Sequence, residues 1–200
     1  MIKILKFIIV LIAIYSCKRI NGFDAKNTQI LTDHKKNFPI ESIKHFPHEI
    51  GHEVNIIYNE GLKNNNLNLY LVERNLSETD INRILSSLNG IKCHRGNDKR
   101  LLIINRNERK VEGFSEFPKI DSSKLKGETP IPNFIDYKNG IYSDPNYEFY
   151  IIHADNKERL FKNETLGGNA SMPSVWKHGI SYGVAVNRDE QNVIYWVAMW

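Results

Sequence analysis

The last eight residues constrain the fold of this chain more than any other feature. Residues 193–200 read VIYWVAMW, so every side chain in the segment is apolar. Successive side chains of a β-strand point to opposite faces, and a strand made from this segment would be apolar on both. Such a strand needs an apolar layer on each side, which predicts a position inside a sheet with Trp200 packed and not frayed.

The segment before the last strand has a different pattern. Residues 180–186 alternate between large apolar and small side chains, which predicts a strand with one large apolar face. The polar residues 188–191 lie between the two segments, so we expect a C-terminal β-hairpin. Aromatic residues crowd this part of the chain, and we expect them in the core and not in a binding platform. They are Trp176, Tyr182, Tyr195, Trp196 and Trp200.

A second hairpin and a helix are expected earlier in the chain. Residues 54–58 and 67–72 have the composition of strands and are separated by a turn-rich stretch, which indicates an antiparallel pair. Ser77 can cap a helix that Gly90 ends. The apolar face of this helix comprises Ile81, Ile84, Leu85 and Leu88.

The other segments are short or weakly patterned. Residues 38–47 suit a short helix closed by its final proline, and residues 101–105 and 147–153 suit strands. Residues 106–146 predict a long loop rich in Pro and Gly. This order predicts an α+β domain with a mostly antiparallel sheet and one or two short helices. It lacks the strand–helix alternation and the glycine-rich phosphate loop of nucleotide-binding folds.

The amino terminus has the pattern of an export signal. Lys3 and Lys6 precede an apolar run at residues 7–15, which is shorter than the roughly 20 residues that a membrane-spanning helix needs. Residues 14–17 read IYSC: an aliphatic residue, a variable one, a small one and then Cys17. This ending resembles the lipobox of bacterial lipoproteins.

The resemblance to lipoproteins implies a cellular location. Residues 1–16 would be removed as a signal peptide, and Cys17 would carry the acyl chains that bind a membrane. The protein would then be held on the bacterial cell envelope, at the outer membrane if there is one. Residues 17–37 would form the lipidated Cys and a flexible polar tether, and residues 38–200 a single α+β domain.

The charge and the cysteine content of the chain limit the kinds of function that it can have. The net charge is +4, and Lys and Arg are interleaved with Asp and Glu, so the sequence has no basic stripe suited to nucleic acid. The chain has two Cys residues, and acylation of Cys17 would leave Cys93 without a partner. His94 follows Cys93, but neighbours on a strand point to opposite faces, so their adjacency does not make a catalytic pair.

One motif invites an enzymatic interpretation. Residues 48–52 read HEIGH and resemble the H-E-x-x-H motif of zinc metallopeptidases over these five residues only. On a helix, His48 and His52 would bind zinc while Glu49 activates a water molecule. Pro47 and the internal glycine disfavour a position in the middle of a helix, and the preceding chain is too short to supply a supporting sheet. We therefore expect no metal and no other cofactor.

The sequence favours a binding role over catalysis. No set of nucleophile, base and oxyanion donor can be assembled from it, so we assign no catalytic residue. The expected function is that of an envelope-anchored lipoprotein with a non-enzymatic binding or interaction role, of a protective or immunity-like kind. Its partners would be the membrane, through the lipid anchor, and another protein. The alternative is an exported zinc-dependent hydrolase that uses the HEIGH motif.

Overall fold

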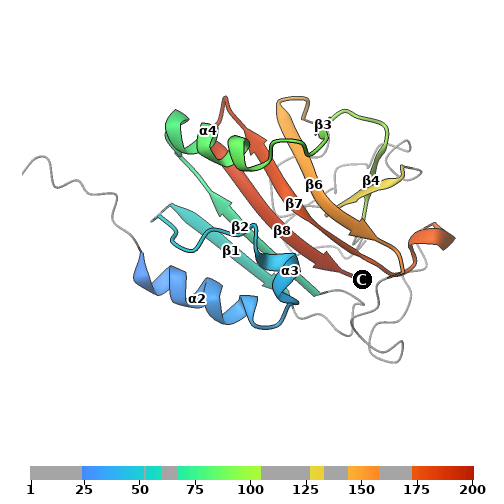
Figure 1. The fold of residues 1–200 in the computed structure, drawn as a ribbon, viewed down its shortest axis with the longest axis horizontal. Coiled ribbons are helices and arrows are strands. Elements are labelled where there is room, and N and C mark those ends of the chain that lie inside the picture. Colours follow the sequence, from blue (N-terminus) through green and yellow to red (C-terminus); the bar gives the residue numbers. More distant parts are fainter. Residues whose placement is uncertain (1–23, 52, 60–66, 105–126, 133–143, 158–172) are drawn as a thin grey trace, which may run out of the picture.

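The computed structural model describes residues 24–51, 53–59, 67–104, 127–132, 144–157 and 173–200. Helices lie on one face of a six-stranded sheet, and a two-stranded sheet lies on the other (Figure 1). This is the predicted α+β fold with a mostly antiparallel sheet. In chain order, its elements are α2 (Ala25–Lys35), α3 (Ile40–Ile43), β1 (Val54–Asn59), β2 (Leu67–Glu73), α4 (Glu78–Ser87), β3 (Cys93–Arg95), β4 (Leu101–Ile103), β5 (Thr129–Ile131), β6 (Tyr147–Asp155), η4 (Ser174–Trp176), β7 (Ile180–Asn187) and β8 (Asn192–Met199).

The large sheet is antiparallel throughout, with β8 inside it. Its strand order is β1-β2-β8-β7-β6-β3. The two predicted hairpins, β1–β2 and β7–β8, are confirmed. Trp196 of β8 lies opposite Tyr70 of β2 and Gly183 of β7. Trp200 is buried, and its N–H donates to the Gly179 carbonyl at 3.0 Å, so the last strand is packed to its end, as predicted.

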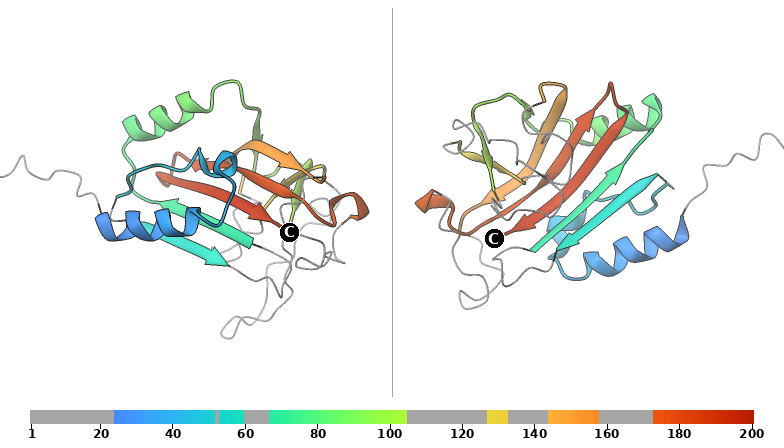
Figure 2. Two further views of the ribbon diagram at one scale, coloured as in Figure 1. Left: turned by 60° about the horizontal axis from the view of Figure 1, so that its bottom comes forward. Right: turned by 180° about the vertical axis from the view of Figure 1, so that it is seen from behind.

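The two faces of β8 contribute to separate apolar cores. On the helical face, Tyr195 belongs to a cluster that includes Leu31 of α2 and Ile81 of α4. On the opposite face, Trp196 belongs to a cluster that includes Ile131 of β5. The views in Figure 2 show α2, α3 and α4 on one side of the sheet, and β4 and β5 on the other. The prediction that β8 is covered on both faces is confirmed.

Two small residues of β7 make room for Trp196. A Cβ at Gly183 would lie 2.8 Å from the indole ring, so a larger residue there would displace the ring. The indole Nε1–H donates to Ser181 Oγ at 3.3 Å, and the Ser181 hydroxyl donates to the Pro130 carbonyl at 2.7 Å. These bonds join β8, β7 and β5 and satisfy the buried polar atoms of the tryptophan and the serine.

The helix predicted after Ser77 is confirmed as α4. Ser77 Oγ accepts a hydrogen bond from the Asp80 N–H at 3.1 Å, which caps the first turn. Gly90 has a φ of 86°, in the left-handed region where glycine commonly follows a helix. Ile81 and Leu88 are buried as predicted, and the other two residues of the apolar face are partly exposed against the same core.

The helix α2 lies where part of a flexible tether was predicted. Residues 25–35 are helical, within the tether expected over residues 17–37. Asp24 caps the helix by accepting two backbone N–H bonds from its first turn at 3.0 Å each. The prediction is wrong for this stretch because Leu31 is the one residue that α2 buries fully, and a single buried position gives no apolar periodicity.

Three short elements also differ from the prediction. The helix α3 ends at Ile43 and is shorter than the one predicted over residues 38–47. The strands β3 and β5 were not predicted, and β5 falls within the loop expected over residues 106–146. Each of these strands has three residues, too few to show a period of two in the sequence.

Candidate functional site

The predicted lipidation site lies outside the described residues. Neither Cys17 nor the signal peptide predicted at residues 1–16 is described by the structure. Among the described residues, no helix combines the length and the apolar character needed to cross a membrane.

Residues 48–51 of the HEIGH segment do not have the helical conformation that a zinc site of this kind requires. His48 and Glu49 are exposed in a bend between α3 and β1. Ile50 is buried, and its carbonyl accepts a hydrogen bond from the Asp24 N–H at 3.2 Å. His52 lies outside the described residues. Within the described part of the chain, no three His, Cys, Asp or Glu side chains are grouped so as to hold a metal ion.

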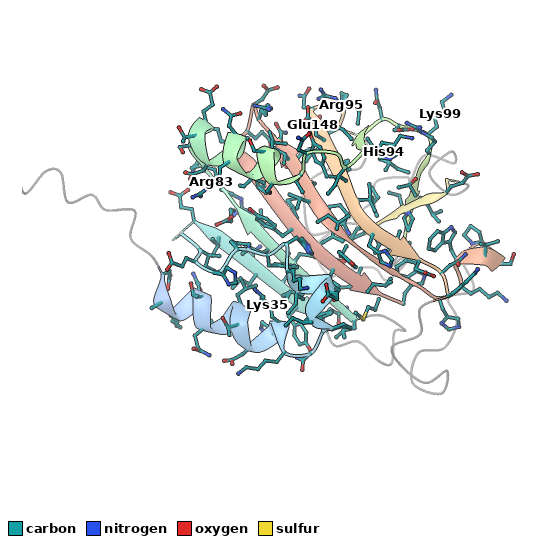
Figure 3. All side chains as sticks on the ribbon, viewed as in Figure 1. Lys35, Arg83, His94, Arg95, Lys99 and Glu148 are labelled. Carbon is teal, nitrogen blue, oxygen red and sulfur yellow. The ribbon has the colours of Figure 1, made fainter. Side chains whose placement is uncertain are left out.

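The pairing of β3 with β6 gathers four polar side chains at one edge of the sheet. Cys93 lies opposite Tyr150, and Arg95 lies opposite Glu148. Arg95 Nη2 is 2.8 Å from Glu148 Oε1, and the Tyr150 hydroxyl donates to Glu148 Oε2 at 2.9 Å. The Cys93 thiol is hydrogen-bonded with the Tyr150 hydroxyl. Figure 3 shows Arg95 and Glu148 together at this edge.

The surroundings of Cys93 do not activate its thiol. Partial burial is the largest effect and raises the thiol pKa; the hydrogen bond with Tyr150 lowers it by less, and the charges of Glu148 and Arg95 have smaller, opposing effects. Because the thiolate is the nucleophilic form, a thiol with a raised pKa is a poor nucleophile at neutral pH. The neighbouring His94 is buried and Cys93 is exposed, so the two side chains lie on opposite faces of β3, as the alternation along a strand requires.

His94 belongs to an ionic cluster that holds the connection between β3 and β4. Its Nδ1 is 2.9 Å from Asp98 Oδ2, and Arg100 Nη2 is 2.6 Å from the same oxygen. The hydrogen bonds from Arg100 hold the pKa of the Asp98 carboxyl far below its usual range. A histidine oriented by a carboxylate supplies two of the three members of a catalytic triad, but Cys93 lies on the other face of the strand. The cluster therefore stabilises the connection between β3 and β4.

Tyr182 of β7 extends the row of polar side chains along the helical face. Its ring centroid is 5.2 Å from that of His153 and 5.6 Å from that of His45, and the three side chains are partly exposed. None of the three helices lies in front of β6 in Figure 1. We define the tyrosine face by six residues of β3, β6 and β7: Cys93, Arg95, Glu148, Tyr150, His153 and Tyr182.

His45 borders the tyrosine face as a neutral imidazole. Its Nε2 is 3.0 Å from the Trp196 carbonyl oxygen, which can only accept a hydrogen bond. Nε2 therefore carries the proton, and Nδ1 is the acceptor. Nδ1 is buried without a hydrogen-bond partner in the described part of the structure. Burial lowers the pKa of His45 to about 4, so the ring stays uncharged at neutral pH and joins the segment after α3 to β8.

A buried carboxyl lies beside α4. The Tyr195 hydroxyl and the Gly51 N–H form hydrogen bonds with Glu73. Burial nevertheless raises the Glu73 pKa to about 6, and nearby Asp80 adds to the effect. Burial also raises the pKa of the Tyr195 hydroxyl, and Glu73 raises it further. Because this pair is enclosed in the core, its titration bears on stability and not on ligand chemistry.

No family model, curated protein or solved structure matches this chain. The candidate site therefore rests on the geometry of the tyrosine face. Sequence reasoning singled out Cys93 but missed Arg95, Glu148 and Tyr150. The signal that brings them together is the pairing of β3 with β6, which no local pattern of a three-residue strand can reveal.

Proposed function

We propose that this chain is a lipid-anchored binding protein of the bacterial envelope, with a non-enzymatic role of a protective or immunity-like kind. The tyrosine face would contact its protein partner. The observation that carries the proposal is the ordered row of Arg95, Glu148 and Tyr150 on a part of the sheet that none of the described helices covers. The lipobox-like ending at Cys17 supports the anchor.

The side chains of the tyrosine face are of the kinds that dominate protein interfaces. Tyr and Arg are enriched at the centres of such interfaces because they combine large contact area with hydrogen bonding. The Arg95 side chain is 56% exposed while Glu148 holds its guanidinium in place. Side chains that are already ordered lose less entropy on binding. The raised thiol pKa of Cys93 also favours binding over covalent catalysis.

Photo-crosslinking in the native envelope tests the partner-binding surface. A photoreactive phenylalanine analogue at position 182 should give a discrete adduct, and Arg95→Ala should reduce that adduct strongly. The matched control places the same analogue at Ser86, on the exposed side of α4. Identical adducts from both positions, or an adduct insensitive to Arg95→Ala, would contradict the assignment of the surface.

The anchor is tested separately. Cys17→Ala should abolish incorporation of labelled fatty acid and move the protein out of the detergent phase, or leave an unprocessed precursor. The reason is that the Cys sulfur is the acylation site in the family that residues 14–17 resemble. Unchanged fatty-acid labelling of the variant would refute the anchor.

Metal content tests the alternative, an exported zinc-dependent hydrolase. The exposed, non-helical His48 and Glu49 give this alternative no support, so we expect substoichiometric zinc in the full chain purified without a histidine tag. A stoichiometric zinc that survives dialysis and is lost in His48→Ala would overturn the binding role in favour of the hydrolase.

A further inference from the structure

Asp24 lies seven residues after the predicted acylation site, Cys17. The Asp24 N–H donates to the Ile50 carbonyl at 3.2 Å, and the Asp24 side chain caps α2. Asp24 is thereby fixed to the segment that leads into β1. Figure 1 shows this end of α2 beside the β1 edge of the sheet, with β3 at the opposite edge.

The chain between Cys17 and Asp24 is short. The Cα atoms of Cys17 and Asp24 are separated by residues 18–23 and can lie at most about 25 Å apart, the length of a fully extended chain. The sheet measures about 24 Å from β1 to β3, at about 4.8 Å between neighbouring strands. A bilayer that holds Cys17 therefore lies within about 25 Å of the start of α2, which is at the β1 edge of the sheet.

An exposed apolar residue lies near the end of α2. Ile40 begins α3 and is 69% exposed. Lys36 and Lys44 lie on either side of it in the sequence, and their exposed ammonium groups pair with Asp33 and Glu41. An apolar side chain between lysines with long alkyl stems suits the headgroup region of a bilayer, where the ammonium groups remain hydrated.

We propose that the corner formed by α2 and α3 rests on the headgroup surface of the bilayer that holds Cys17, with Ile40 as its apolar contact. The inference rests on the proposed function, because it needs the lipid anchor. The 11 residues of α2 span about 16 Å, which is less than the reach of residues 18–23. One membrane plane therefore accommodates both Cys17 and Ile40.

This orientation leaves the tyrosine face accessible to a partner. Figure 3 shows Lys35 of α2 well separated across the sheet from Arg95 and Glu148 at the β3–β6 edge. The described chain also offers an internal control, since Val175 of η4 is 63% exposed on an element that follows β6 and is remote from α2. Exposed area alone therefore does not distinguish Ile40 from Val175, whereas distance from the anchor does.

Lipid quenching of a site-specific dye tests the orientation. The full acylated chain is reconstituted in vesicles of phosphatidylethanolamine and phosphatidylglycerol that carry nitroxide labels at the headgroup. Two variants, Ile40→Cys and Val175→Cys, are compared in a Cys93→Ser background, so that each carries one reactive thiol. We expect quenching several-fold stronger at position 40 than at position 175.

The outcomes separate this inference from the proposed function. Acylated protein with equal quenching at both positions, or with stronger quenching at position 175, would overturn the orientation and leave the anchor intact. Protein without fatty acid at Cys17 would refute the anchor, and the orientation with it. Substitution of Ile40 by Asp, with the dye at Gln29→Cys on α2, should weaken quenching at α2, and no change there would refute the contact by Ile40.

Discussion

Trp196 is the residue on which the packing of the sheet depends most directly. Its indole is fully buried between Gly183, Phe149 and Ser181, to which it donates a hydrogen bond. Trp196→Ala would leave a large cavity and remove the donor to Ser181 Oγ, so we expect a loss of about 3–5 kcal/mol in the free energy of unfolding. Denaturant unfolding measures it, with the exposed Val175→Ala as control. Equal midpoints for the two variants would show that the indole is not a core residue.

Glu73 makes the stability of the protein depend on pH. The folded state keeps the Glu73 proton up to about pH 6, whereas the pKa of this carboxyl in the unfolded chain is 4.5. The folded state therefore binds more protons in this window and loses stability as the pH rises through it, by about 2 kcal/mol in full. Glu73→Gln should be more stable than the parent above pH 6, and no more stable below 4.5. Urea unfolding across this range measures the difference, and a variant less stable at neutral pH would contradict it.

His45 makes the stability of the protein depend on pH in the opposite direction to Glu73. Its pKa falls from 6.5 to about 4 on folding, so the folded state binds fewer protons in this window and loses stability as the pH falls through it. Gln at position 45 can still donate to the Trp196 carbonyl but does not titrate. We expect His45→Gln to lose less stability than the parent between pH 6.5 and 4. Parallel profiles for the variant and the parent would mean that His45 is not held neutral.

At the scale of elements, α2 is a helix that the sequence pattern did not predict, and two substitutions test whether it packs on the sheet. Leu31 is the one fully buried residue of α2 and belongs to the core under the sheet, so Leu31→Ala should cost about 2–5 kcal/mol. Gln29→Ala, on the exposed side of the helix, should change stability by less than about 0.5 kcal/mol. Thermal unfolding of the two variants measures the contrast. If residues 25–35 were a loose tether, both substitutions would be neutral.

Elements with long, regular patterns were predictable, and the three-residue strands β3 and β5 were not. The alternation in β7 and the uniformly apolar residues 193–200 specify the positions of the last two strands, because successive side chains of a strand point to opposite faces of the sheet. Ser77 and the spacing from Ile81 to Leu88 likewise specify α4. The strands β3 and β5 form because an adjacent strand supplies their hydrogen bonds, and that adjacency is a property of the tertiary fold.

At the scale of the whole molecule, the candidate site was only partly predictable because the tertiary fold brings its residues together. Cys93 drew attention as a lone cysteine, whereas Glu148 and Arg95 are ordinary surface types in the sequence. Their ion pair exists because β3 returns to the sheet after α4 and pairs with β6 on the far edge. The lipid anchor, by contrast, is a local signal in residues 14–17, so sequence reasoning can propose it without the fold.

The position of β8 makes the six-stranded sheet a single unit. This strand separates β1 and β2 on one side from β7, β6 and β3 on the other. Deleting residues 195–200 would remove the buried Tyr195, Trp196 and Trp200 and would leave β2 and β7 with unpaired backbone edges. We expect the shortened chain to lack a cooperative unfolding transition and to be cleaved rapidly by protease. A cooperative melt in circular dichroism would show that the two halves fold without β8.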